Sequence, residues 1–310
     1  MNILMTGASG LVGTALVTEL ARQDRTIYRL VRPGAAKPTK NSPNVLDLPW
    51  NPKTGDISFD GIQRERKFEN ADAVINLAGA PVVEGRWTPE RKALLRSSRV
   101  NTTRGLVTAL TNLSKRPRVM ISASAIGYYG NRGDELLTES SEGGNDFLAD
   151  LAKEWEGEAK QAEGLGVRVV LLRLGIVLAK HGGALPAMMT PFKMGMGGKL
   201  GSGRQWMSWV ALDDVVGIIC RALDDESFSG AVNVVAPEAI RNSDFTKALA
   251  HAMHRPAIFA APAFVLRLAL GEMADAALLA SERVVPEKLT KLRHQFLHPK
   301  LDETLQHLLN

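Results

Sequence analysis

The sequence predicts an α/β fold built on a doubly wound parallel sheet, followed by a small, mainly helical C-terminal domain. Apolar runs of strand length alternate with helical apolar periodicity over most of the chain. A glycine-rich turn joins the first of these strands to the first helix. Beyond Arg241 the strand-like runs cease and helical patterns remain. These observations predict two domains, residues 1–240 and residues 241–310.

The composition argues against a nucleic-acid partner. The chain has 310 residues, of which 45% are hydrophobic, so it can bury a full core. Its net charge of +5 is spread without a long basic run, and only 5% of residues are aromatic. A nucleic-acid groove needs clustered cations interleaved with aromatic side chains. The modest positive excess suits an anionic small molecule instead.

Cysteine and histidine usage predicts a reducing compartment and no metal site. The one cysteine, Cys220, lies in an apolar helical stretch, so no disulfide framework is expected. The one close histidine pair, His251 and His254, has no cysteine or carboxylate at metal-ligand spacing. No leader pattern precedes the first strand, and no apolar run reaches about eighteen residues. A cytoplasmic protein without membrane spans is therefore expected.

The first element is a short apolar strand, residues 2–5, which runs into the turn TGASGLVG at residues 6–13. Glycines at a spacing of three let the backbone turn tightly and approach a pyrophosphate, which then lies against the N–H groups of the following helix. An ordinary glycine-rich turn is the alternative, but the flanking strand and helix favour a dinucleotide-binding turn. The expected cofactor contacts are Gly7, Ser9, Gly10, Leu11, Val12 and Gly13.

The end of the second strand, residues 26–31, selects the kind of dinucleotide. A fold specific for NAD usually places a carboxylate about twenty residues beyond the glycines, whereas an arginine there accommodates a 2′-phosphate. Here Arg32 follows the strand, and no carboxylate is present. Because guanidinium pairs bidentately with phosphate, the sequence predicts NADP (NADPH) rather than NAD. A solvated surface arginine is the alternative.

The third strand signal is the apolar run at residues 73–80, which is typical of a strand buried on both faces of a parallel sheet. Near its end the small residues Ala78 and Gly79 would let a ribose or adenine approach the carboxyl edge of the sheet. A plain turn after a buried strand would look the same. In the basic helix expected at residues 88–113, most cations should be solvated, and Arg99 could face the cofactor.

A hydroxyl-bearing segment, SAIGYYG at residues 124–130, follows another strand at residues 118–123. The carboxyl end of a central strand is where a doubly wound enzyme would hold a substrate carbonyl or alcohol, so Ser124 is a candidate catalytic residue. The alternatives are a turn-forming serine and, for Tyr128 and Tyr129, packing residues with a wet tip.

Two later segments are candidates for covering a small-molecule substrate. Glycines frame a basic stretch within residues 181–210, an insertion expected on the substrate side, although ordinary surface loops share this composition. The apolar tail is too interrupted by charge to span a membrane. We expect it to fold over the substrate cleft or to form a subunit contact, as in a homodimer. Its large apolar residues are Phe259, Phe264, Leu266, Leu268 and Leu270.

As a set, these motifs resemble the extended short-chain dehydrogenase/reductase superfamily and, within it, the atypical NADP-binding SDR39U1/YfcH-like family of epimerase-like proteins. The resemblance covers nearly the whole chain. It implies an NADP-bound Rossmann domain with a small C-terminal domain, and it makes Arg32, Leu77, Ala78 and Arg99 cofactor contacts by position. It rests on TGASGLVG (6–13), LVRP (30–33), NLAGAP (76–81), GRWTPERK (85–92), SSRVNTT (97–103), SAIGYYG (124–130), DFLADLAKEWE (146–156), GSGRQWMSWV (201–210) and VVPEKL (284–289).

One departure from the superfamily bears on catalysis. Active members carry a Tyr-x-x-x-Lys pair in which the tyrosine moves a proton to or from the substrate oxygen. Phe147 and Leu151 stand at these positions here, and Lys153 lies half a turn further round the helix. Tyr129 is the expected substitute acid, with Ser124 holding the reacting oxygen. Two hypotheses follow: an NADP-dependent oxidoreductase or epimerase-like enzyme acting on a small polar substrate, or a catalytically weak or inactive NADP-binding sensor or structural protein.

Overall fold

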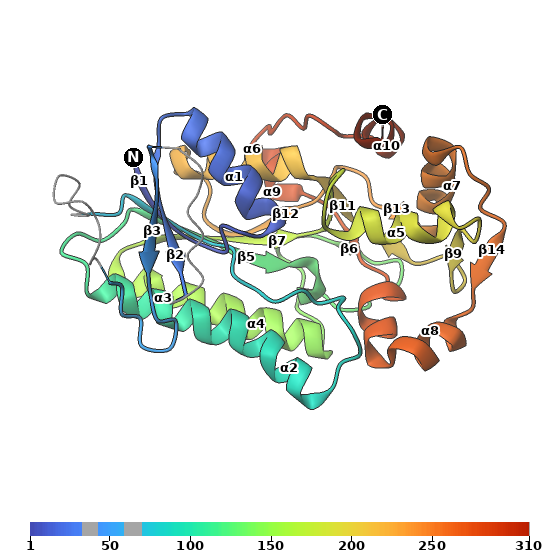
Figure 1. Cartoon of the computed structure of the whole chain (residues 1–310), viewed down its shortest axis with the longest axis horizontal. Helices are drawn as coiled ribbons and strands as arrows, with labels where there is room; N and C mark the ends of the chain where they lie inside the picture. The colour runs from blue at the N-terminus through green and yellow to red at the C-terminus, as the bar shows by residue number, and fades with distance from the viewer. Residues whose placement is uncertain (33–42, 59–69, 310) are drawn as a thin grey trace.

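The computed structural model describes residues 1–32, 43–58 and 70–309. At its centre lies a seven-stranded sheet in the order β12-β7-β5-β4-β1-β2-β3, in which every neighbouring pair is parallel (Figure 1). This is the predicted Rossmann-type, doubly wound fold. The strands are β1 (Asn2–Thr6), β2 (Thr26–Val31), β3 (Val45–Pro49), β4 (Ala73–Asn76), β5 (Val119–Ala125), β7 (Arg168–Leu174) and β12 (Gly230–Val234).

Helices cover both faces of the sheet. In Figure 1, α1 (Leu11–Arg22) and α6 (Leu212–Asp224) lie above it, whereas α3 (Thr102–Thr111) and α4 (Phe147–Lys160) lie below. Alternate side chains of β1 enter the two cores: Ile3 packs with Leu16 on one side, and Leu4 packs with Leu106 on the other. Because both faces are covered, the strands are continuous apolar runs, as the sequence predicts.

The helix expected at residues 88–113 is divided into three parts. Thr88 caps α2 (Pro89–Arg96) by accepting a hydrogen bond from the N–H of Arg91 at 3.2 Å. A π-helical turn, η1 (Ser97–Asn101), separates α2 from α3. Such wide turns are rare and often occur at functional sites. This one carries Arg99.

The expectation that no strands follow Arg241 was wrong, because two very short strands there pair with earlier ones. Each has two or three residues and a distant partner, so no local periodicity reveals it. The small ladders join β9 (Gly198–Leu200) to β14 (Phe259–Ala261), β6 (Leu136–Leu137) to β15 (Arg283–Val284), β8 (Ile176–Leu178) to β11 (Trp209–Ala211), and β10 (Trp206–Met207) to β13 (Ile240–Arg241).

The C-terminal segment packs on the insertion that precedes it. Phe245 and Leu305 share one apolar core with Phe192 and Trp209, and Leu289 returns to the main core under β12. The division at residue 240 therefore stays a prediction. No helix in the described ranges is long and apolar enough to cross a membrane. The remaining helices are α5 (Ala184–Lys193), α7 (Asn242–Met253), α8 (Ala263–Leu270), α9 (Glu287–Lys291), α10 (Leu301–Leu309), η2 (Ile126–Tyr128), η3 (Gln161–Leu165) and the π-helical η4 (Ala274–Leu278).

Candidate functional site

Two glycines of the turn lie too close to neighbouring backbone to carry a side chain. Gly7 has φ of +68°, and a Cβ there would lie 2.4 Å from the carbonyl carbon of Leu77. A Cβ on Gly13 would lie 2.1 Å from the carbonyl oxygen of Gly7. The N–H of Gly10 donates to that same oxygen at 3.1 Å and closes the turn. Gly7 and Gly13 therefore let β1, α1 and the end of β4 approach one another closely.

The start of α1 is open to an anion. The N-cap residue of the helix is Gly10, so no side chain occupies the free N–H groups there, and no acidic residue lies in the first turn. Ser9 and Gly10 are exposed, while Leu11 and Val12 are half-buried. The first N–H groups of a helix have no partner within the helix, and its dipole favours negative charge there. The cradle thus fits the pyrophosphate of a dinucleotide.

The end of β4 forms the side of the cradle. The N–H of Leu77 donates to the carbonyl oxygen of Thr6 at 3.3 Å. Leu77 and Ala78 are half-buried, and Gly79 is exposed. These three predicted contact residues therefore lie beside the glycine turn, where the small residues Ala78 and Gly79 leave the backbone accessible.

A buried polar network supports this edge of the sheet. Asn76, fully buried, accepts a hydrogen bond from the hydroxyl of Thr6 at 2.7 Å. Its amide donates to the hydroxyls of Thr103 at 2.8 Å and Ser122 at 3.1 Å. The indole of Trp155 also donates to the Thr103 hydroxyl, at 2.9 Å. The network fixes β1, β4, β5, α3 and α4 relative to one another. Sequence reasoning missed it because Asn76 sits inside an otherwise apolar run.

Arg99 is a half-buried cation at the same edge. Its guanidinium donates to the carbonyl oxygens of Ala80 at 2.9 Å and Leu95 at 3.3 Å, and its Cζ lies 3.0 Å from where a Cβ on Gly79 would be. Burial, with a smaller contribution from Arg91, lowers the pKa of Arg99 to about 10. No carboxylate of the described segments pairs with it. The guanidinium also lies 5.3 Å from the centroid of the Trp155 ring. A partly desolvated cation with no carboxylate partner among the described residues suits an anionic group beside Gly79.

Arg32 follows β2 directly and is exposed. The parallel register pairs Met5 of β1 with Arg29 of β2, so the end of β2 lies beside the glycine turn. Arg32 makes no ion pair with the residues that the structure describes, and residues 33–42 lie outside them. Its contact with a 2′-phosphate therefore stays a prediction.

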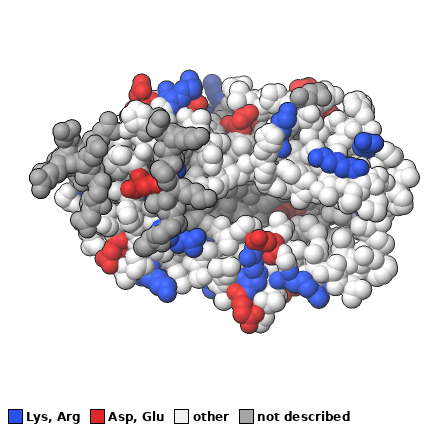
Figure 2. Space-filling view, viewed as in Figure 1, with Lys and Arg blue, Asp and Glu red and all other residues white. Residues whose placement is uncertain are grey.

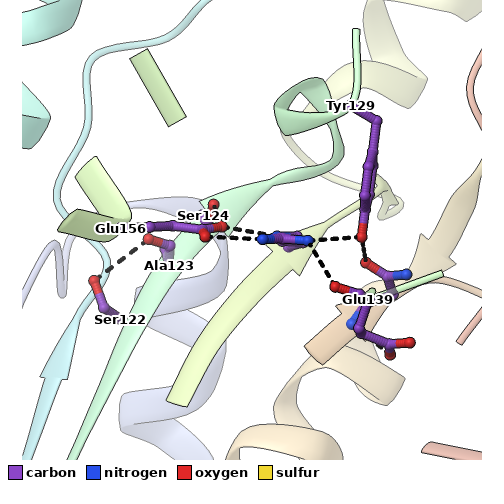
Figure 3. Close-up of polar contacts among 8 residues, drawn as sticks. Ser122, Ala123, Ser124, Tyr129, Glu139 and Glu156 are labelled. Carbon is purple, nitrogen blue, oxygen red and sulfur yellow. Dashed lines mark hydrogen bonds and ion pairs between the residues drawn. The ribbon is translucent and has the colours of Figure 1, made fainter. Parts of the chain in front are cut away.

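Ser124 and Tyr129 belong to a buried ionic network (Figure 3). The Ser124 hydroxyl donates to Glu156 Oε1 at 2.7 Å, and Arg173 donates to both oxygens of Glu156 at 2.8 and 3.0 Å. Arg173 also donates to the Tyr129 hydroxyl at 2.9 Å, which in turn donates to Asn233 Oδ1 at 2.7 Å. Despite the opposing effect of burial, the hydrogen bond with Glu156 raises the pKa of Arg173.

Neither of the two hydroxyls predicted to be catalytic is accessible to solvent. Tyr129 is fully buried, and Ser124 is 2% exposed. Burial raises the pKa of Tyr129 to about 12, although Arg173 and Asn233 oppose the shift. Their contacts favour a positioning role over contact with a substrate, so their assignment as catalytic residues is an untested prediction.

Tyr128 lies on the outer side of this network. The Arg173 guanidinium stacks on its ring at 3.4 Å from the centroid. Tyr128 is half-buried, and its hydroxyl makes no hydrogen bond within the described part of the chain. A Cβ on Gly143 would lie 3.1 Å from Tyr128 Cζ and 2.5 Å from Lys153 Cε. The phenol end of Tyr128 and the Lys153 side chain therefore approach each other at Gly143.

The position of the missing catalytic tyrosine is filled by an apolar cluster. The Phe147 ring packs edge-to-face on Trp87 at 5.2 Å, and the Lys92 ammonium lies 4.8 Å from its centroid. Leu151 is buried in the same cluster, which Met273 of the C-terminal segment completes. The usual acid–base pair is thus replaced by packing between α2, α4 and the C-terminal segment.

A groove of about 520 Å³ opens beside the cradle. Its lining includes Ser9, Thr14 and Thr18 from the turn and α1, and His181 from the insertion. A Cβ on Gly183 would lie 2.8 Å from Leu11 Cδ2, so the predicted insertion packs on the cradle. The face in Figure 2 is hollowed near its middle, with both signs of charge around the hollow rather than one basic stripe.

The family model for the NAD dependent epimerase/dehydratase family matches residues 3–235. The chain belongs to this family. The model of a domain of unknown function, DUF1731, matches residues 261–308. These matches confirm the resemblance that the motifs carry.

Individual relatives extend over the whole chain. An epimerase family protein of Mycobacterium leprae is 36% identical over 305 residues, covering 98% of this chain and 94% of the relative. The chloroplastic SDR39U1 homolog of Arabidopsis thaliana is 35% identical over 311 residues, covering 100% and 87%. The human epimerase family protein SDR39U1 (isoform 2), solved with NADPH, superposes with a TM-score of 0.86 at 28% identity, covering 100% and 99%.

Proposed function

We propose that this protein is an NADP(H)-dependent oxidoreductase or epimerase-like enzyme that acts on a small polar substrate. The observation that carries the proposal is the cradle at Gly7 and Gly13, whose backbone surface ends beside Arg99, a cation with no carboxylate partner in the described ranges. The human relative solved with NADPH supports the choice of cofactor. In this proposal the pyrophosphate lies at the start of α1, and Arg32 pairs with the 2′-phosphate.

The nicotinamide supplies hydride chemistry, and the protein must supply a proton to the substrate oxygen. We assign that proton transfer to Tyr128. It is half-buried, its hydroxyl has no hydrogen-bond partner among the described residues, and its ring rests on Arg173 with Lys153 near its phenol end. Tyr128 would thus donate the proton that the missing tyrosine donates in other members, from a different position at the carboxyl end of the sheet.

Ser124 and Tyr129 then act as positioning residues. Through Glu156 and Arg173 they hold a guanidinium flat beneath Tyr128. This assignment replaces direct contact between the two hydroxyls and the substrate.

The test is NADPH oxidation by the purified chain with a panel of small carbonyl compounds and sugar nucleotides. We expect turnover that Tyr128→Phe abolishes while NADPH binding, followed by nicotinamide fluorescence, is unchanged. Tyr129→Phe keeps the ring and should lower kcat less than Tyr128→Phe. If Tyr128→Phe keeps full activity and Tyr129→Phe loses it, the proton transfer belongs to Tyr129.

A second candidate function is cofactor binding without turnover. The packing of Phe147 against Trp87, where an acid–base tyrosine would be, favours it. Such a protein binds NADPH but oxidises none of the panel, and Tyr128→Phe and Ser124→Ala leave its cofactor affinity unchanged.

A further inference from the structure

Three potential metal ligands from distant parts of the sequence meet at the surface beside the C-terminal helix. Asp213 lies in the first turn of α6, His298 precedes α10, and His307 lies on α10. Their ligand atoms all lie within 4.8 Å of one another. His298 Nε2 is 3.6 Å from Asp213 Oδ2, and the two imidazole rings are stacked with centroids 4.8 Å apart.

The backbone that carries His298 is held in place independently of this cluster. The buried carboxylate of Asp214 accepts hydrogen bonds from the N–H groups of Leu297 at 2.6 Å and His298 at 3.0 Å. Leu305 is fully buried in the core under α10, which fixes the helix that carries His307. The three ligands are thus presented by an ordered scaffold, a requirement for a metal site.

The donor set selects the class of ion. Two imidazole nitrogens and one carboxylate oxygen suit zinc and neighbouring transition metals, whereas Mg²⁺ and Ca²⁺ prefer oxygen ligands throughout. Zinc bonds to these atoms are about 2.0–2.2 Å long, so the ligands must close inward. Asp213 and His307 are exposed and can rotate to do so.

We propose that Asp213, His298 and His307 bind one divalent transition-metal ion of the zinc class, which staples α10 to α6. The proposal is independent of the cofactor and of catalysis. It departs from the sequence-based expectation of no metal, which considered His251 and His254. Those rings are 6.5 Å apart, and the two histidines belong to no metal-ligand cluster in the part of the chain that the structure describes.

The test is calorimetric titration of Zn²⁺ into the tag-free, full-length chain after dialysis against EDTA. We expect one ion per chain and a raised Tm, because a ligand that binds only the folded state stabilises it. His298→Ala and His307→Ala should each weaken Zn²⁺ binding by at least about tenfold. Asp213→Asn, which keeps the side-chain shape, should also weaken it. Mg²⁺ should raise Tm in none of them.

His251→Ala is the matched control and should bind Zn²⁺ as the wild type does. NADPH affinity should be equal in the wild type and His307→Ala, which shows that the variant is folded and that the two sites are separate. The proposal is overturned if the His298→Ala/His307→Ala double variant binds Zn²⁺ as tightly as the wild type, or if His251→Ala removes the binding.

Discussion

The cofactor edge comprises the glycine turn, the start of α1, the end of β4 and Arg99, whereas the proposed proton-transfer edge comprises Ser124, Tyr128, Tyr129 and the start of α4. Both lie at the same sheet but differ in how closely they follow the superfamily. At the cofactor edge, the glycines of the turn, the free start of α1 and the small residues after β4 are all present, and Arg99 adds a partly desolvated cation. At the proton-transfer edge, Phe147 packs in an apolar cluster, and Ser124 and Tyr129 are sealed in an ionic network. Cofactor binding and acid–base chemistry can therefore be retained separately on one fold.

The largest expected effect comes from a substitution in the ionic network at the proposed proton-transfer edge. Glu156→Gln leaves Arg173 buried without its carboxylate partner and should lower the free energy of unfolding by about 3–5 kcal/mol. Urea denaturation measures it. Glu158→Gln, two residues along α4, is the control: it breaks only the solvent-screened pair with Arg104 and should lower the free energy of unfolding far less. Similar losses in both variants would contradict a structural role for the network.

The next largest effect comes from a substitution in the glycine turn of the cofactor edge. Gly7→Ala adds about 1–3 kcal/mol of backbone strain at φ +68° and drives a methyl group into the backbone of Leu77. It should lower the Tm and abolish measurable NADPH binding in a fluorescence titration. Gly157→Ala is the control: it lies in α4 with open space around its Cβ and should stabilise the protein by about 0.5–1 kcal/mol. Full NADPH binding by Gly7→Ala would rule out the cradle.

A smaller effect sharpens the role of the Arg99 cation. Arg99→Met keeps an unbranched, apolar stem but removes the guanidinium and its charge, and it should weaken NADPH binding about tenfold, or about 1.4 kcal/mol. Because the variant loses the hydrogen bonds to the carbonyls of Ala80 and Leu95 and the contact with the Trp155 ring, the Tm of the cofactor-free protein should fall slightly, and the affinity is measured below that Tm. Calorimetry with NADPH measures the affinity. Arg104→Met, an exposed arginine one turn further on, should bind NADPH normally, and an equal loss there would contradict the assignment.

The glycine-rich turn could be predicted from the sequence because it is local. A strand, three glycines and a helix follow one another within the first 22 residues, and their spacing alone specifies the turn. The long-range contacts were not predictable in this way. In the sequence, Glu156 is a charged residue of an expected helix and Arg173 is a charged residue of an expected strand. No periodicity indicates that the two form an ion pair. The place of Arg99 depends on a π-helical turn that has no reliable sequence signal.

The assignments at the proton-transfer edge show the same limit. Tyr128 and Tyr129 are adjacent, so the sequence cannot say which ring is buried. The fold places Tyr129 fully inside and leaves Tyr128 half-buried. The cluster of Asp213, His298 and His307 spans almost a hundred residues of sequence, and only the packing of α10 near α6 brings it together.

We propose that the cofactor edge binds NADP(H) and distinguishes it from NAD(H) through Arg32. The most direct test is a pair of calorimetric titrations of the wild type and Arg32→Glu, one with NADPH and one with NADH. We predict that the wild type binds NADPH more tightly than NADH and that Arg32→Glu loses several-fold more affinity for NADPH than for NADH, because its target is the 2′-phosphate. Absence of NADPH binding by the wild type would show that this edge is not an NADP(H) site, and equal losses for both cofactors in the variant would show that Arg32 does not contact the 2′-phosphate.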